Sequence, residues 1–495
     1  MSNTNDMTVG APTRQIISFA LPLVLGYLLQ QFYNVADAAI VGQCVGVEAL
    51  AAVGASSSIM FLVMGFCCGT CQGFAIPVAQ AFGAKNLQLM RRYASQAVRI
   101  SAVIAVVVTV VACLCCRWIL QLINTPEAIM PEASLYLYLQ FLLVPVAIAY
   151  NLLAAFIRAL GNSRQPFYFL IFSSLLNILL DVFFVAVVRW GVAGAGVATI
   201  LAQAWAAWLC WRYIRRELPV LGIAGAAESA GANGATGVTE ATEADGANGA
   251  HRPYGPHSAQ WPHSTQWPQL PQPAITRKLL WNGLPMGLQF SITAIGSIML
   301  QSSNNALGTD YVAAFTAAMR VKYVFTCVFE NIGVAMATYC GQNRGAGRID
   351  RVSRGLRSAM LITMVYFVFT LCVIYPLADE MMALFVDPSE QLIISEAARF
   401  MRLCNYFYPV LGLLTVLRYS IQGLGYAHLS LMSGVMEMLA RTGVSLWIVP
   451  LLGFTGVIMG DPIAWLSADL FLVPCMLVLL AHLRRLHYLE KGGTL

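Results

Sequence analysis

Acidic side chains inside apolar stretches are the first sign of chemistry in this sequence. The stretch at 21–42, LPLVLGYLLQQFYNVADAAIVG, is long enough to cross a bilayer as a helix of about 20 residues, yet it contains Asp37. Gln30, Asn34 and Asp37 follow a spacing of i, i+4 and i+7, which places them on one helical face. A carboxylate at membrane depth costs roughly 2.5–3.5 kcal/mol even on the lenient insertion scale. We therefore predict an ion or proton site at Asp37, the alternative being an acid at the headgroup level.

A second polar set follows in two later apolar stretches. Asp181 lies within SSLLNILLDVFFV, and Asn177 precedes it by one helical turn on the same face. Thr199 adds a hydroxyl from the next stretch. With Asp37, these groups could hold a hard cation through oxygen ligands, or share a proton, because burial and like charge both favour a protonated carboxyl. The alternative is that Asn177 and Asp181 only join helices together. The predicted coupling set is Asp37, Asn177, Asp181 and Thr199.

Composition decides the class of protein that holds these groups. Of the 495 residues, 58% are hydrophobic and only 11% are charged, whereas soluble chains are nearer 25% charged. This predicts an all-α polytopic membrane protein. The net charge of +6 does not indicate a nucleic-acid partner, because the basic residues form short clusters between apolar stretches. We expect no metal site, since the thirteen cysteines fall mostly within apolar runs and pack as small hydrophobes.

The sequence also bears on the energy source. The glycine-rich string that begins at Gly191 lacks the order of a dinucleotide-binding fingerprint, and no phosphate-binding loop occurs. We therefore expect a protein that is not an enzyme, has no catalytic residues, and uses no cofactor beyond H⁺ or Na⁺ as a coupling ion.

Twelve apolar segments are predicted, six on each side of a break. They cover 16–41, 50–78, 96–122, 134–160, 166–188, 191–214, 276–305, 312–341, 356–378, 395–423, 428–452 and 455–483. The Ala/Gly-rich break cannot bury a core. We predict an N-terminal six-helix lobe at 1–217, a disordered linker at 218–274, and a C-terminal six-helix lobe at 275–495. Basic residues fall in alternate loops, which by the positive-inside rule places both termini and the linker in the cytoplasm. We expect the chain to lie in the plasma membrane.

The two halves repeat each other. Leu21-Pro22 corresponds to Leu284-Pro285, and Gln80-x-x-Gly83 corresponds to Gln342-x-x-Gly345, at a nearly constant offset. Because each half has an even number of segments, both insert in the same orientation. This predicts a parallel repeat about an axis along the membrane normal, with substrate bound between the halves. Pro22 is the expected hinge of the first helix.

The second half lacks the first half's polar set, since Arg441 and Ser445 align with Asn177 and Asp181. Its own ionisable residues are Lys322, Glu330, Glu437 and Arg441. Glu437 and Arg441, spaced i,i+4, are predicted to form a structural ion pair. The expected substrate-cavity residues come from both halves. They are Gln30, Asn34, Tyr150, Asn151, Gln289, Gln301 and Asn304. For those in the second half, the alternative is that they only pack helices together.

Several strings together resemble the multidrug and toxic compound extrusion (MATE) family. They are the first helix with Pro22 and Asp37, VGVEALAAVG, the two QxxG elements, RALGNSRQP at 158–166, and CGQNRGAG at 340–347. The resemblance implies V-shaped lobes that alternate in access, and antiport of organic, often cationic, compounds against protons or sodium ions. It places the coupling set in the family's first-lobe cation site and Gln30 in the cavity near it. The acidic cluster that another branch of the family carries on its seventh and tenth helices is missing here, which argues against second-lobe sodium coupling.

Two other classes remain as alternatives. A flippase for lipid-linked precursors would need several unpaired arginines in its cavity, and the sequence offers only Arg441, with Glu437 beside it. A receptor or scaffold would not need buried carboxylates in one lobe. The expected partners are small organic cations or drugs and membrane lipid, with the protein a monomer.

Overall fold

The computed structural model describes residues 4–44, 47–122, 130–221, 271–387 and 389–490 of the chain. Within these ranges, the side chains of 33–59 lie outside the described set. The described chain is helical and contains no strand. Eleven helices are long and apolar enough to cross a membrane, and one bent helix pair brings the number to twelve. This confirms the prediction of an all-α protein with twelve transmembrane segments.

The first half holds six of these segments. They are α1 (Pro12–Cys44), α2 (Val47–Gly83), α3 (Leu87–Leu122), α4 (Met130–Ala159), α5 (Arg164–Asp181) with its π-helical continuation η1 (Val182–Val187), and α6 (Gly191–Glu217), which the short turn η2 (Pro219–Leu221) follows.

The second half repeats the pattern. It comprises α8 (Gln272–Asn305), α9 (Thr309–Gly345), α10 (Ile349–Ala383), the pair α11 (Gln391–Tyr406) and α12 (Tyr408–Gly423), α13 (Ala427–Gly443) with η3 (Val444–Ile448) and α14 (Val449–Leu452), and α15 (Phe454–Glu490).

One predicted segment is broken. The sequence indicated a single helix over 395–423, but α11 and α12 meet at an angle of 54°. The break lies at Phe407, two residues before Pro409, which has no N–H to donate to the preceding turn. The corresponding Pro145 lies inside α4, which runs on as one helix. The same residue type therefore breaks the span in only one of the two halves.

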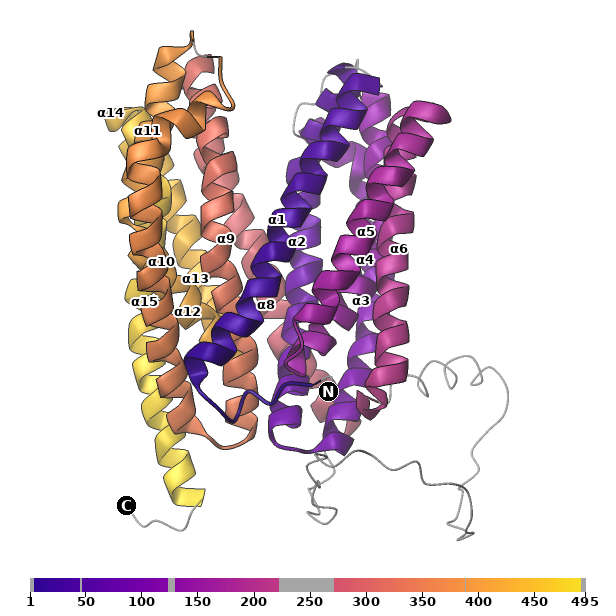
Figure 1. Cartoon of the computed structure of the whole chain (residues 1–495), viewed down its shortest axis with the longest axis vertical. Coiled ribbons are helices and arrows are strands. Elements are labelled where there is room, and N and C mark those ends of the chain that lie inside the picture. The colour runs from indigo at the N-terminus through magenta and orange to yellow at the C-terminus, as the bar shows by residue number, and fades with distance from the viewer. Residues whose placement is uncertain (1–3, 45–46, 123–129, 222–270, 388, 491–495) are drawn as a thin grey trace.

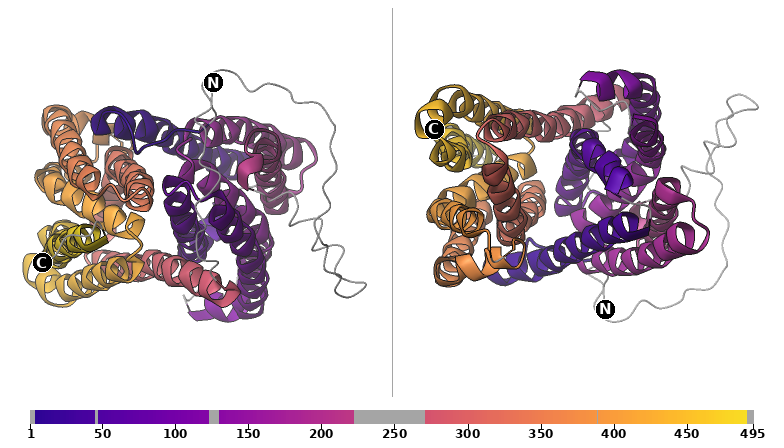
Figure 2. Two further views of the ribbon diagram at one scale, coloured as in Figure 1. Left: turned by 90° about the horizontal axis from the view of Figure 1, so that it is seen from below. Right: turned by 90° about the horizontal axis from the view of Figure 1, so that it is seen from above.

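The two halves lie side by side and converge at the end of the molecule where both termini are found (Figure 1). Toward the other end they diverge as a V. Seen along the long axis, α1 and α8 run between the two bundles (Figure 2). Accordingly, α1 contacts α5 but also α9 and α10, and α8 contacts both α2 and α13. Phe19 on α1 packs in the hydrophobic core of the second half. Residues 222–270, which make up most of the predicted linker at 218–274, lie outside the described residues, and the lobe boundaries stay a prediction.

The converging end depends on two glycines. A Cβ atom on Gly83 of α2 would lie 1.9 Å from the carbonyl oxygen of Gln342, and one on Gly345 of α9 would lie 1.8 Å from that of Gln80. No side chain fits at either distance, so α2 and α9 approach backbone to backbone. The glycine of each QxxG element is therefore needed for the close contact that joins the two halves.

Candidate functional site

A cavity of about 730 Å³ opens within the first half. That volume is in the range that drug-sized ligands occupy. The described residues that line it come from α1, α2, α4, α5 and α6, with only Asn331 and Val334 from α9. The sequence predicted a site between the halves, whereas the structure places the cavity mainly in the first half, with α9 forming one edge.

The polar set of α5 and α6 borders this cavity. Asn177 and Thr199 line it, while Asp181 is fully buried. With its NH₂ group turned toward the carboxylate, the Asn177 amide donates to Asp181 Oδ2 over 2.9 Å and accepts from the Thr199 N–H over 3.3 Å. An ionised carboxylate can only accept hydrogen bonds, so it requires this orientation of the amide. The structure therefore brings together three of the four predicted coupling residues.

The local backbone helps to position Asp181. It is the last residue of α5, and the π-helical turn η1 begins directly after it. A π-turn inside a helix is frequently found at a functional site, because it re-aims side chains relative to a regular helix. The second half has a π-turn at the corresponding place, where Val444 follows Gly443.

Asp37 and Asn34, the remaining predicted polar residues of the first helix, lie in α1, but their side chains fall outside the described residues. Gln30, one turn before Asn34, lines the cavity, and so does the proposed hinge residue Pro22. α1 runs through Pro22 as one helix from Pro12 to Cys44.

The other predicted cavity residues divide between the halves. Tyr150 and Asn151 of α4 line the cavity. The three from α8 do not: Gln289 accepts hydrogen bonds from Gln422 and Ser430, each over 2.7 Å. In the same helix, Gln301 donates to Asn305 over 2.8 Å and Asn304 is fully buried. Asn304 Oδ1 has no hydrogen-bond partner among the described residues. None of the three α8 amides lines the cavity in this conformation.

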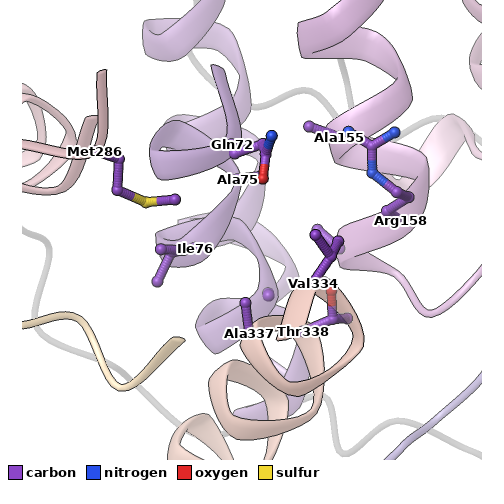
Figure 3. Close-up of a pocket in the computed structure, with 11 residues that line it drawn as sticks. Gln72, Ala75, Ile76, Ala155, Arg158, Met286, Val334, Ala337 and Thr338 are labelled. Carbon is purple, nitrogen blue, oxygen red and sulfur yellow. The ribbon is translucent and has the colours of Figure 1, made fainter. Parts of the chain in front are cut away.

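Sequence reasoning missed one charged cavity residue. Arg158, in the last turn of α4, is the one residue with a full charge among the described side chains that line the cavity. It also lines a small pocket of about 40 Å³ where α2, α4, α8 and α9 meet. Figure 3 shows the Arg158 side chain extending along α4 toward Ala155, on the opposite wall of the small pocket from Met286. Arg158 is the first residue of the string RALGNSRQP, which supported the family resemblance but was not interpreted as part of the cavity.

The second half contains a buried charged network that is larger than the predicted pair. Glu437 and Arg441 form the expected ion pair, at 3.3 Å. Glu437 also pairs with Arg418 of α12, and the Arg441 Nε donates to Asp461 of α15 over 2.9 Å. Asp461 in turn pairs with Lys322 of α9. The network therefore joins four helices.

The predicted set of second-half ionisable residues was therefore incomplete. It left out Arg418, Asp461 and Asp469, of which the two acids lie inside the apolar run at 455–483. Glu330 accepts a hydrogen bond from the Tyr419 hydroxyl over 3.0 Å. Asp469 is 6% exposed, and neither of its carboxylate oxygens has a hydrogen-bond partner among the described residues. Arg441, the arginine considered for a flippase, pairs with two acids, Glu437 and Asp461, and does not line the cavity.

Together these features define a class: a multi-pass membrane protein with a drug-sized cavity and a buried carboxylate at the cavity wall. The MatE family model matches residues 22–183 and again 285–447, so each half begins its match at a corresponding proline, Pro22 and Pro285. The chain therefore belongs to the MatE family of multidrug efflux transporters, and the double match confirms the internal repeat.

Relatives and solved structures agree. The Bacillus subtilis (strain 168) protein named "Probable multidrug resistance protein YpnP" is 25% identical over 444 residues, which cover 90% of this chain and 88% of that protein. The structure titled "Crystal structure of MATE in complex with MaL6" superposes with a TM-score of 0.81 at 19% identity, covering 97% of this chain and 99% of that one. An outward-facing MATE family transporter of the MOP superfamily gives 0.81 at 20% identity, with 97% and 98% covered. These likenesses establish the V-shaped fold.

Proposed function

We propose that this protein is a cation-coupled antiporter that exports organic compounds, many of them cationic, by alternating access, with protons or sodium ions as the driving ion. The observation that carries the proposal is the contact of the buried Asp181 with Asn177, a residue that also lines the cavity. One side chain thus touches both the carboxylate and the space available to a substrate.

This contact offers a route for coupling. A protonated Asp181 gains an O–H donor, whereas an ionised one can only accept, so the proton changes which hydrogen bonds the Asn177 amide can make. Because Asn177 lines the cavity, this change alters the polar groups that the cavity presents. Because linkage is reciprocal, a substrate that binds better to the ionised form must expel the proton when it binds. We propose Asp37 and Thr199 as the other members of this site.

Further parts of the proposal rest on sequence and topology. We place both termini in the cytoplasm, because the basic loops should lie on that side of the membrane. We further propose that the protein is a monomer in the cytoplasmic membrane. Drug substrates are proposed because relatives are named as multidrug resistance proteins. A flippase is not favoured, since Arg158 is the single arginine among the described cavity residues.

The test uses protein reconstituted into liposomes with an imposed pH gradient. Asp181→Asn should abolish ethidium transport, and it should also abolish the protons that the purified wild type releases when substrate is added in weak buffer. Asp350→Asn, an identical change at an exposed position in the first turn of α10, serves as the control and should transport normally. Normal transport by Asp181→Asn would disprove the coupling role. Release that depends on added sodium would identify sodium as the coupling ion.

A further inference from the structure

Arg158 has no acidic partner among the described residues. No described side chain forms an ion pair with it, and the ionisable groups that face it are the Tyr150 hydroxyl and the thiols of Cys68, Cys71 and Cys210. None of these is a carboxylate. Arg158 is half-buried and lines the cavity. A partly desolvated guanidinium without an anionic partner favours a bound group that can accept its hydrogen bonds.

The position of Arg158 shows what could provide that acceptor. Helical side chains lean toward the N-terminus of their helix, so a residue in the last turn of α4 extends back along the helix into the cavity rather than out of the membrane. Arg158 and Gln72 line both the main cavity and the small pocket where the two halves meet. The guanidinium therefore stands at the junction of the two spaces, where a bound compound can reach it.

The other described residues that line the cavity carry no full charge beside the Arg158 guanidinium. Around Arg158 they present neutral groups: the Gln72 amide, the Tyr150 hydroxyl and the Asn151 amide. Asn151 Nδ2 donates to the Ala147 carbonyl over 2.9 Å, so its amide oxygen is left for a ligand donor. Asp181, the acid that contacts the cavity wall, is on α5, and Arg158 is on α4. The positive group of the cavity and the proposed coupling acid are therefore carried by different helices.

We propose that Arg158 is an anion subsite, and that the preferred substrates are zwitterionic or amphoteric aromatic compounds whose carboxylate pairs with its guanidinium. The planar fork of an arginine matches a carboxylate in a bidentate geometry. This inference rests on the proposed transport function, since it names the substrate class of the same cavity. It differs from a lipid-pyrophosphate site, which would need more than one arginine around the ligand.

The test measures binding by the purified full-length protein of two dyes that share one xanthylium ring. Rhodamine 110 has a free benzoate, and rhodamine 123 is its methyl ester. By fluorescence anisotropy, the wild type should bind the acid about 10- to 100-fold more tightly than the ester, the range expected for a hydrogen bond to a charged group. Arg158→Gln should reduce binding of the acid to the level of the ester and leave binding of the ester unchanged.

Two further variants complete the design. Arg164→Gln removes an exposed arginine six positions later that does not line the cavity, and it should leave both affinities unchanged. Arg158→Lys keeps the charge without the fork and should retain a smaller preference for the acid. Equal affinity of the wild type for both dyes, an equal loss of both in Arg158→Gln, or no preference in Arg158→Lys would overturn the proposal. Because binding needs no ion gradient, these results are independent of whether Asp181 couples transport to protons.

Discussion

Gln80 and Gln342 make the same contact in opposite directions across the two halves. Gln80 Nε2 of α2 donates to the Gly423 carbonyl of α12 over 3.0 Å, and Gln342 Nε2 of α9 donates to the Ala159 carbonyl of α4 over 2.9 Å. Each glutamine belongs to one copy of the repeated QxxG element and caps a helix end of the opposite half. Together with Gly83 and Gly345, they form a symmetric joint at the converging end.

This joint should control the balance between the two access states. Gly345→Ala should shift the protein away from the conformation described here, because the new Cβ would lie 1.8 Å from the Gln80 carbonyl oxygen. Spin labels at the exposed positions Gln88 and Arg354 should report a longer distance across the joint. Gly341→Ala, one turn earlier on α9, meets its nearest atom at 3.3 Å and should change the distance little. An unchanged distance in Gly345→Ala would show that the joint does not set the balance.

The N-terminal segment should stabilise the same end. Met7 is fully buried, its N–H donates to Gln342 Oε1 over 2.8 Å, and the Asn343 amide donates to its carbonyl over 3.1 Å. Met7→Ala should lower stability by about 2–5 kcal/mol, the cost of truncating a buried methionine, seen as a lower melting temperature in detergent. The control is Val9→Ala, because Val9 is 50% exposed and should tolerate the change. Equal melting temperatures for both variants would contradict a structural role of this segment.

Two buried acids of α15, Asp461 and Asp469, should differ in how much they contribute to stability. Asp461→Asn removes the partner that Lys322 and Arg441 share and should destabilise the protein by about 3–5 kcal/mol, because a buried charge is left uncompensated. Asp469→Asn should cost less than about 1 kcal/mol, since the Asp469 carboxylate loses no described hydrogen bond. Thermal unfolding of the two variants, eight residues apart on α15, gives the comparison. A larger loss for Asp469→Asn would reverse the assigned roles.

The sequence predicted the helices well because an apolar run of membrane length has few alternatives to a helix. It also predicted Asn177, Asp181 and Thr199 as one cluster, since helical spacing and two adjacent segments suffice to bring them together. It did not predict the bend before Pro409, because Pro145 gives the same local signal inside an unbroken helix. Nor could it find the partners of Arg418 or the setting of Arg158, since these depend on how distant helices pack. Met7 was missed because a short polar terminus carries no periodic pattern.

The last prediction concerns the pH dependence of transport. Asn177→Asp would place a second carboxyl group beside Asp181, in the position where the amide now lies 2.9 Å from Oδ2. Two carboxylates at that distance cannot both ionise readily, so the pair should hold a proton to higher pH than Asp181 alone. The midpoint of the pH profile for substrate-induced proton release should therefore move to higher pH. Asn151→Asp, in the same cavity but bonded to the Ala147 carbonyl in the native chain, tests whether any added acid has this effect. A similar rise in both variants would mean that the cavity's total charge, and not the contact between residues 177 and 181, sets the proton affinity. A rise in Asn177→Asp alone would place the proton at that contact.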